Sequence, residues 1–371
     1  MRRNMVKILI VFLVALVAIP SVSGLGKTLW VDADRGNDRF GDGGETRPFK
    51  TITHALSVAS AGDTIKVRAA SRKYDEATGE RFPISMKPKV AIIGVSRPTI
   101  SGGSPYTLYD PLEGATTTRY VSVLGADSSL ISGFMFLAKD GEGSPGTSIL
   151  CNSTSPRIID NIFRATGSAH AGIATLGTAQ PQIQKNVFLG SLNWGITVYG
   201  ESYPTITDNK FSTSNGIDCT SRSHPTIENN EISTNGAGIS TKGQSSPTIR
   251  RNTISGNDGW GIMVRMDSTP AIQDNLITDN PVGIYIGEGN PIPDIGGGGR
   301  SHGNNTFNNS NWDIENHSRY NISARANHWS SPFCEDIYAK IYDKEEEARV
   351  GEVDTGICLP RTTRVSRRIL E

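Results

Sequence analysis

Apolar residues in the middle of the chain follow a pattern that repeats about every 22 residues. Six segments share the pattern Pro-x-Ile-x-x-Asn-x-Phe/Ile and begin at Pro156, Pro181, Pro204, Pro225, Pro247 and Pro270. The intervals between them are 25, 23, 21, 22 and 23 residues. A Gly-Ile pair lies nine residues before five of these prolines, at Gly172, Gly195, Gly216, Gly238 and Gly261. An internal period of this kind determines the architecture of the whole segment.

Within each repeat, apolar residues alternate around the Gly-Ile pair, as with Ile196 and Val198. Alternation with a period of two predicts a strand with one buried face. The repeats are too short and too rich in Gly, Ser, Thr and Asn for two helices each. We therefore predict an all-β fold, a right-handed parallel β-helix in which each repeat forms one coil, with coils stacked about 4.8 Å apart.

An asparagine occupies the same place in every repeat. An Asn side chain tolerates a left-handed backbone at a tight turn, and its amide can donate a hydrogen bond to the equivalent residue of the next coil. An amide has no proton that titrates near neutral pH, so we assign these residues a structural rather than a catalytic role. They are Asn161, Asn186, Asn209, Asn230, Asn252 and Asn275.

The chain ends differ from the repeats. Residues 48–60 carry apolar side chains at helical spacing, which predicts a short N-terminal capping helix over the open end of the solenoid. The glycine run 296–299 interrupts the period before the last coils. We expect a signal peptide at 1–24 and a solenoid at 25–330, with its cap at about 29–68 and its regular coils at about 147–290. A C-terminal extension is expected at 331–371.

The first residues predict export. A basic start is followed by an apolar run from Ile8 to Ile19 and then by small residues, as in a secretory signal peptide. The run is shorter than the roughly 20 apolar residues that a membrane span needs, so we expect no membrane insertion after cleavage. The predicted location is secreted, periplasmic or cell-surface. Because 37 basic residues balance 37 acidic ones, the chain lacks the basic excess that nucleic-acid binding requires.

Four cysteines follow the predicted signal peptide, and their spacing matches no metal-binding pattern. Cys334 and Cys358 bracket a C-terminal segment without a repeat, and we expect a disulfide between them, with two free buried thiols as the alternative. Alternation predicts that Cys219 faces the core and that Cys151 faces outward. These two should therefore not pair.

The Pro-x-Ile-x-x-Asn and Gly-Ile rows resemble the right-handed parallel β-helix repeats of the pectin-lyase-like superfamily. The segment around Leu29-Trp30-Val31-Asp32 and Arg47-Pro48-Phe49-Lys50 resembles the uncharacterised domain that opens many exported β-helix proteins. Together the two resemblances cover about residues 29–330. They imply a fold and leave the reaction open, because this architecture carries lyases, hydrolases, epimerases, adhesins and proteins of unknown role.

Positions two and four after each Gly should point outward beside the Gly-Ile strand. They place Asp218, Lys242 and Arg265 on adjacent coils. The resemblance to pectate lyases implies that such a face holds calcium between carboxylates and uses Arg or Lys as the base, and these three residues are the catalytic candidates. Calcium is expected only in that case, since no row aligns two carboxylates on adjacent coils. The alternative is a solvated face with weak ion pairs.

Aromatic residues on the same side suggest a glycan groove. Trp194 and Trp260 precede Gly-Ile pairs three coils apart, or roughly 14 Å at 4.8 Å per coil. Sugar rings offer C–H faces on which aromatic rings stack. The predicted substrate-binding residues are Trp194, Tyr199, Trp260, Met263 and Tyr285. The alternative is that both tryptophans pack over turns.

Two functional classes follow. The first is an exported, carbohydrate-binding or structural β-helix protein whose partner is a polysaccharide, with no cofactor and no metal. The second is a lyase or hydrolase that acts on an acidic glycan through the outward face. The sequence does not decide whether the protein is an enzyme, and it leaves the oligomeric state open. A copper-handling relative shares the fold, but the six His and six Met are scattered.

Overall fold

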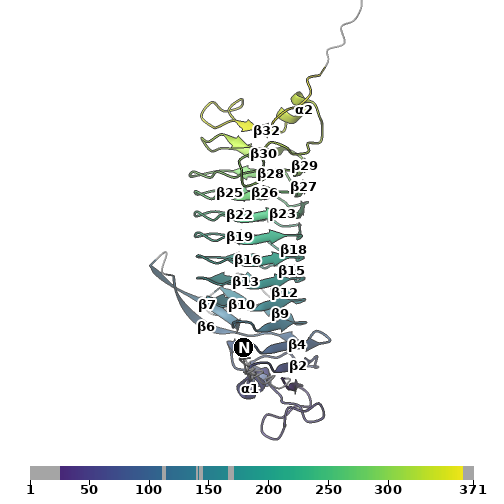
Figure 1. The fold of residues 1–371 in the computed structure, drawn as a ribbon. Coiled ribbons are helices and arrows are strands. Elements are labelled where there is room, and N and C mark those ends of the chain that lie inside the picture. Colours follow the sequence, from purple (N-terminus) through teal and green to yellow (C-terminus); the bar gives the residue numbers. More distant parts are fainter. Residues whose placement is uncertain (1–25, 111–113, 139–140, 142–144, 166–170, 362–371) are drawn as a thin grey trace, which may run out of the picture.

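The computed structural model describes residues 26–110, 114–138, 141, 145–165 and 171–361. The predicted signal peptide at 1–24 lies outside these residues. The described chain is a parallel β-solenoid of about 11 turns with two α-helices (Figure 1). No helix in these ranges is long and apolar enough to cross a membrane.

Three mainly parallel sheets run along the solenoid, and a regular coil contributes one short strand to each. The ten-stranded sheet contains β1 (Thr28–Val31), β2 (Thr64–Arg68), β4 (Ala91–Val95), β8 (Leu130–Ser132), β11 (Arg157–Ile159), β14 (Gln182–Gln184), β17 (Thr205–Thr207), β20 (Thr226–Glu228), β23 (Thr248–Arg250) and β26 (Ala271–Gln273). The nine-stranded sheet contains β5 (Thr99–Ile100), β9 (Met135–Ala138), β12 (Ile162–Ala165), β15 (Val187–Leu189), β18 (Lys210–Ser212), β21 (Glu231–Ser233), β24 (Thr253–Ser255), β27 (Leu276–Thr278) and β29 (Thr306–Asn308).

The twelve-stranded sheet carries the predicted Gly-Ile strands. Its parallel strands are β3 (Ile84–Ser85), β7 (Ala115–Leu124), β10 (Gly146–Asn152), β13 (Ala171–Leu176), β16 (Trp194–Val198), β19 (Ile217–Cys219), β22 (Ala237–Thr241), β25 (Trp260–Val264), β28 (Val282–Ile286), β30 (Trp312–Asn316) and β32 (Ile341–Tyr342). One further strand, β6 (Ser104–Asp110), pairs antiparallel with β7 and forms a hairpin that projects from the solenoid (Figure 1).

Both ends of the solenoid carry additional elements. The predicted capping helix is present as α1 (Ile52–Val58), with Thr51 as its N-cap and Ile52, Ala55 and Leu56 buried. After residue 330, α2 (Cys334–Tyr338) is followed by β32, which extends the twelve-stranded sheet. A separate pair joins β31 (Ile322–Ser323) to β33 (Val353–Asp354). The C-terminal segment therefore continues the strand pairing of the coils.

The aligned asparagines form the predicted ladder. Each Nδ2 donates to the Oδ1 of the next Asn in the series, for example Asn209 to Asn230 at 3.1 Å, and also to a backbone carbonyl. The ladder continues beyond the repeats to Asn305 and Asn327. The left-handed residue is the one before each Asn, such as Asp208 with φ 57°, so the expectation of a left-handed Asn was wrong. The amide side chains supply hydrogen bonds to the buried turn, and the residue before each Asn adopts the left-handed backbone conformation.

Beside this ladder the core is built from stacked side chains of equivalent residues. Phe136, Phe163, Phe188 and Phe211 stack with centroid distances of 5.0, 4.8 and 4.7 Å. A second asparagine ladder, which the sequence analysis missed, precedes the twelve-stranded sheet and runs through Asn235, Asn257, Asn280 and Asn309. Its sequence signal is an Asn ten residues after Pro225, Pro247 and Pro270.

The ladder predicts a large and local cost for removing one amide. Asn230→Ala leaves the backbone N–H of Asn209 without its acceptor, and it also removes the hydrogen bonds that the Asn230 amide donates to Ile206 O and Asn252 Oδ1. Each buried group without a partner costs about 1–3 kcal/mol, so the free energy of unfolding should fall by at least about 2 kcal/mol. Urea denaturation measures this difference. The exposed Asn311→Ala is the control and should change stability by less than about 0.5 kcal/mol. Equal effects of the two variants would contradict the ladder's role.

Candidate functional site

The outer face of the twelve-stranded sheet, meaning the side turned away from the solenoid core, brings the predicted site residues into register. Strand pairing aligns Thr197 with Asp218, Asp218 with Ser240, and Ser240 with Met263. The next pairs in the same row are Met263 with Tyr285 and Tyr285 with Glu315. A neighbouring row, two residues further along each strand, carries Tyr199, Thr220, Lys242 and Arg265. The Gly-Ile alignment therefore predicted the rows correctly.

Three residues in the first of these two rows are more buried than predicted. Thr197, Asp218 and Ser240, here called the polar row, have exposed fractions of 0, 2 and 0 %. Alternation identifies the side of the sheet on which a residue lies, but it cannot show how far the rows on either side cover it. Thr197 Oγ1 is buried and has no hydrogen-bond partner among the described residues, while Asp218 Oδ1 and Ser240 Oγ make no hydrogen bond of good geometry there, although Ser240 lies close enough to Asp218 to lower its pKa. Such atoms are uncommon in native proteins and commonly mark a functional group or a water site.

Asp218, Lys242 and Arg265, the predicted catalytic candidates, lie together. Lys242 Nζ is 3.2 Å from Asp218 Oδ2, and Arg265 follows Lys242 one coil further on. Burial raises the pKa of Asp218, and the Lys242 ammonium and Arg265 guanidinium only partly oppose this. Arg265 Nε is buried without a partner in the described part of the chain. The cluster thus contains a desolvated carboxyl group and two cations, one of which lacks an anion.

An aromatic cluster lies toward the C-terminal end of the outer face. Ring centroids are 5.7 Å apart for Trp260 and Tyr285, 5.5 Å for Tyr285 and His317, and 4.7 Å for His317 and Tyr342. Trp312 completes the cluster at 5.6 Å from Tyr342. Its members come from four consecutive strands of the sheet and from the residue just after β30. Trp260 is 37 % exposed, so part of this aromatic surface faces solvent.

The position of Tyr285 depends on a glycine. A Cβ on Gly287 would lie 2.4 Å from Cε1 of Tyr285, so the ring folds over a position that only glycine leaves free. Burial raises the pKa of Tyr285, and the nearby carboxylates of Glu315 and Glu288 raise it further. Glu315 in turn lies 2.7 Å from His317 Nε2. Sequence analysis named Trp260 and Tyr285 but missed Trp312, His317 and Tyr342, because the glycine run shifts the repeat before them.

The remaining predicted binding residues lie apart from this cluster. Trp194 is on β16, three strands from Trp260 in the sheet. Met263 is only 8 % exposed and lies in the same row as Asp218 and Ser240, so its role as a binding residue stays a prediction. Tyr199 lies at the hairpin end, where the guanidinium carbon of Arg119 is 5.2 Å from its ring centroid.

The β6–β7 hairpin closes the other end of the outer face. Leu108 and Val121 of the hairpin form an apolar cluster with Leu150, Ala174 and Leu176 of the coils. Arg119, on β7, is 7 % exposed, and its Nε and Nη1 atoms have no hydrogen-bond partner among the described residues. Arg119 belongs to no repeat, so the sequence pattern offered no sign of it.

The outward prediction for Cys151 was also wrong. Cys151 pairs in register with Thr175, in the row that continues through Val198 to Cys219, and it is fully buried. Its coil carries Ser148-Ile149 where later coils carry Gly-Ile, which removes the marker used for alignment. Burial raises the pKa of both thiols, as expected for inert core cysteines.

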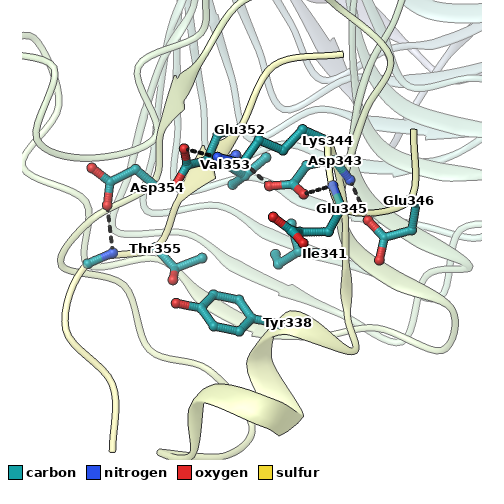
Figure 2. Close-up of a pocket in the computed structure, with 11 residues that line it drawn as sticks. Tyr338, Ile341, Asp343, Lys344, Glu345, Glu346, Glu352, Val353, Asp354 and Thr355 are labelled. Atoms are coloured by element: carbon teal, nitrogen blue, oxygen red, sulfur yellow. Dashed lines mark hydrogen bonds and ion pairs between the residues drawn. The ribbon is translucent and has the colours of Figure 1, made fainter. Parts of the chain in front are cut away.

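A separate hollow of about 510 Å³ lies in the C-terminal segment and is lined by acidic residues (Figure 2). Two of its carboxylates already have partners: Asp343 accepts from the backbone N–H groups of Glu345 and Val353, and Glu352 pairs with Lys344 at 2.6 Å. Across the described ranges, no three His, Cys, Asp or Glu side chains are grouped so as to hold a metal ion. This hollow therefore offers fewer free polar groups than the outer face.

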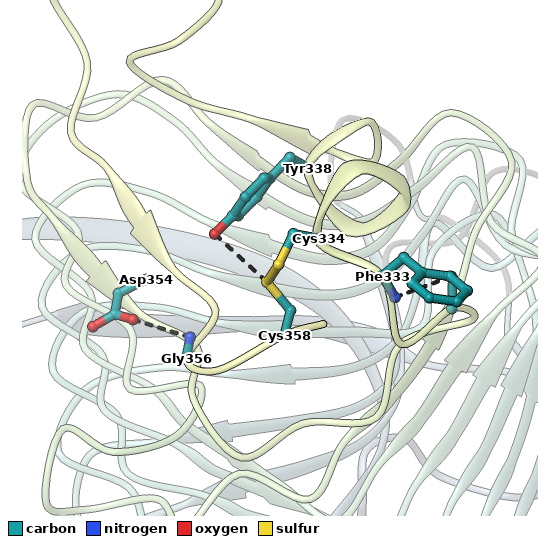
Figure 3. The surroundings of a disulfide bond; sticks show 7 residues. Phe333, Cys334, Tyr338, Asp354, Gly356 and Cys358 are labelled. Atoms are coloured by element: carbon teal, nitrogen blue, oxygen red, sulfur yellow. Dashed lines mark hydrogen bonds between the residues drawn. A yellow bond between two sulfur atoms is a disulfide. The ribbon is translucent and has the colours of Figure 1, made fainter. Parts of the chain in front are cut away.

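The expected disulfide joins Cys334 and Cys358 next to this hollow (Figure 3). The bond ties α2 to the chain beyond β33, and Tyr338 Oη lies 3.8 Å from Cys358 Sγ. Cys151 and Cys219 are free. The pairing predicted from the position of the cysteines is thus confirmed.

The stacked parallel sheets define a parallel β-helix protein. The sequence matches the family described as "Protein of unknown function (DUF1565)" over residues 35–242 and 195–333. The chain belongs to this family. Comparison with curated proteins gives no match.

Solved structures of similar fold include several sugar-active proteins. The GH136 lacto-N-biosidase from Eubacterium ramulus is 12% identical, with a TM-score of 0.47 over 89% of this chain and 67% of that one. A double mutant of the periplasmic alginate epimerase AlgG is 12% identical, with a TM-score of 0.46 over 80% and 77%. The Yersinia enterocolitica family 28 exopolygalacturonase is 10% identical, with a TM-score of 0.44 over 90% and 77%. Likeness at this level concerns the fold alone.

The buried Asp218 predicts a pH-dependent effect of its replacement. Because burial raises the pKa of this group in the folded protein, its ionisation costs folding free energy as the pH rises through that pKa. Asp218→Asn should therefore gain stability relative to the wild type as the pH rises above about 4, the ordinary carboxyl range. Urea titrations at increasing pH measure the difference, with the exposed Asp258→Asn as control. A variant that instead loses stability as the pH rises would show that the ion pair with Lys242 outweighs burial.

Proposed function

We propose that the protein is an exported carbohydrate-binding or structural β-helix protein and that its outer face holds a polysaccharide. The aromatic cluster carries this proposal: five rings in a continuous series of contacts, partly exposed at Trp260, form a surface on which sugar rings can stack. Ring stacking supplies area at a small cost in side-chain entropy. The cluster runs along the coil axis, so it suits an extended chain of sugars.

The polar row supports the same proposal. Its three residues lie on successive coils, in the row that continues through Met263 to Tyr285, and one buried oxygen of each makes no hydrogen bond of good geometry among the described residues. Sugar hydroxyl groups both donate and accept hydrogen bonds, so they can satisfy hydroxyl and carboxyl oxygens alike. A buried polar atom left without a partner costs about 1–3 kcal/mol, and a ligand that pairs with it recovers part of that free energy.

Export rests on two features. The first residues have the pattern of a secretory signal peptide, although they lie outside the described part of the chain. The disulfide between Cys334 and Cys358 is typical of an oxidising compartment. A polysaccharide partner is most accessible at such a location.

The aromatic cluster predicts a binding loss when one ring is removed. Trp260→Ala should weaken binding of the recognised polysaccharide at least about tenfold, equivalent to about 1.4 kcal/mol, because its ring supplies exposed stacking area. Glycan arrays identify the ligand, and affinity electrophoresis or calorimetry measures the change. Phe40→Ala removes an aromatic residue that is 63 % exposed at the far end of the chain and should leave affinity unchanged. Equal affinities of wild type and Trp260→Ala would refute the stacking surface.

A second candidate function is supported by the Asp218 cluster. Cleavage of an acidic glycan by elimination needs a base near the sugar C5 proton and a cation near the acid group. Lys242 and Arg265 lie one coil apart and can fill these roles, while Asp218 holds Lys242 in place. This arrangement gives the lyase interpretation a geometric basis, and calcium is expected only if that interpretation holds.

The lyase candidate predicts turnover that depends on Lys242. Incubation with polyuronates should generate unsaturated sugar ends, followed by their ultraviolet absorbance, and Lys242→Met should slow the reaction at least about 100-fold. Lys210→Met, at an exposed ion pair on the nine-stranded sheet, is the matched control and should retain the wild-type rate. Failure of the wild-type protein to produce unsaturated ends from any uronate polymer leaves binding as the function.

A further inference from the structure

Arg119 is a buried cation that pairs with no anion among the residues that the structure describes. It is 7 % exposed, its Nε and Nη1 atoms have no hydrogen-bond partner in the described ranges, and it takes part in none of the ion pairs found there. Burying a guanidinium group costs several kcal/mol unless a counter-charge and hydrogen bonds compensate. A protein retains such a group only where the cost is offset elsewhere or where a ligand supplies the missing partner.

The contacts made by Arg119 offset only part of this cost. Its guanidinium lies over the ring of Tyr199, and cation–π contacts of this kind contribute about 1–2 kcal/mol. An apolar cluster lies nearby, since Leu108 and Val121 of the hairpin pack on Leu150. A low-dielectric setting strengthens any charge pair that forms there. The hairpin thus holds a desolvated guanidinium at the edge of the outer face.

Resting on the proposed glycan function, we propose that Arg119 forms a subsite for one acid group of the bound glycan, a carboxylate or a sulfate. The planar guanidinium matches two acceptor oxygens of such a group, and two of its nitrogens lack partners. Tyr199 supports the guanidinium from its other side. The ligand class is therefore an acidic rather than a neutral polysaccharide.

Charges along the outer face give the ligand a direction. Arg119 lies beside Tyr199, and two further cations, Lys242 and Arg265, continue the same row toward the C-terminal end. The carboxylates of Glu288 and Glu315 lie beyond them, around Tyr285. Acid groups of the glycan are thus favoured at the hairpin end, and neutral ring faces at the aromatic cluster. The distance from Tyr199 to Trp260 is about three coils, or roughly 14 Å, so a ligand that reaches both is an oligosaccharide.

Matched ligands test this subsite without any variant. Uronate oligosaccharides and the same oligosaccharides with their carboxyl groups reduced to alcohols are titrated into the wild-type protein by calorimetry. The proposal predicts at least about tenfold tighter binding of the acidic form. Equal binding of both forms overturns the acid subsite and leaves the proposed glycan function standing. Absence of binding to either form, or to any glycan on an array, overturns both. Sodium acetate at matched concentration should not raise the melting temperature, and an equal rise would show a site for free anions instead.

The variant Arg119→Met distinguishes a ligand-binding role of Arg119 from a purely structural one. Methionine has a similar length and packs well against an aromatic ring. The variant should lose the preference for the acidic ligand and, without ligand, should melt at a higher temperature than the wild type, because the unpaired buried charge is gone. Arg157→Met, an exposed position on the ten-stranded sheet, is the control and should change neither property. A variant that melts lower and keeps the acidic preference overturns the proposal.

Discussion

Stacking of coils in exact register is the constraint on which the rest of the structure depends. Each coil is too short to bury its own apolar residues, so the core exists only where equivalent residues of successive coils meet. The Asn161–Asn327 ladder enforces that register, because each amide bonds both to the next amide and to a backbone carbonyl. The stacked phenylalanines repeat at 4.7–5.0 Å, close to the spacing of paired strands.

The same register builds the outer face. Side chains on that face are placed at one-coil intervals, so a row of equivalent positions becomes a linear array along the solenoid. The outer face collects six of the thirteen buried polar atoms that lack partners in the described ranges. They belong to Arg119, Thr197, Asp218, Ser240 and Arg265. A protein selected for stability alone would satisfy or remove such atoms, and their concentration on one face is typical of a binding surface.

The repeat made most of the solenoid predictable. The Gly-Ile pairs identified the strands of the twelve-stranded sheet and the row containing Asp218, and the Pro-x-Ile-x-x-Asn motif identified the main ladder. The predictions failed where the period is lost. Cys151 lies in a coil without Gly-Ile, and Trp312 and His317 follow the glycine run. Arg119 lies in an antiparallel hairpin whose pairing is independent of the repeat. Burial of Thr197 and Ser240 depends on neighbouring rows, which one-dimensional alternation does not describe.

The outer face combines two kinds of ligand-binding group: a desolvated cation at the hairpin and partly exposed aromatic rings toward the C-terminal end. A crystal structure of the protein with a bound acidic oligosaccharide tests this account most directly. The account predicts sugar rings against Trp260 and Tyr285, and sugar hydroxyl groups within hydrogen-bond distance of Thr197, Asp218 or Ser240. An oligosaccharide found only in the C-terminal hollow, or against one of the other two sheets, would contradict it.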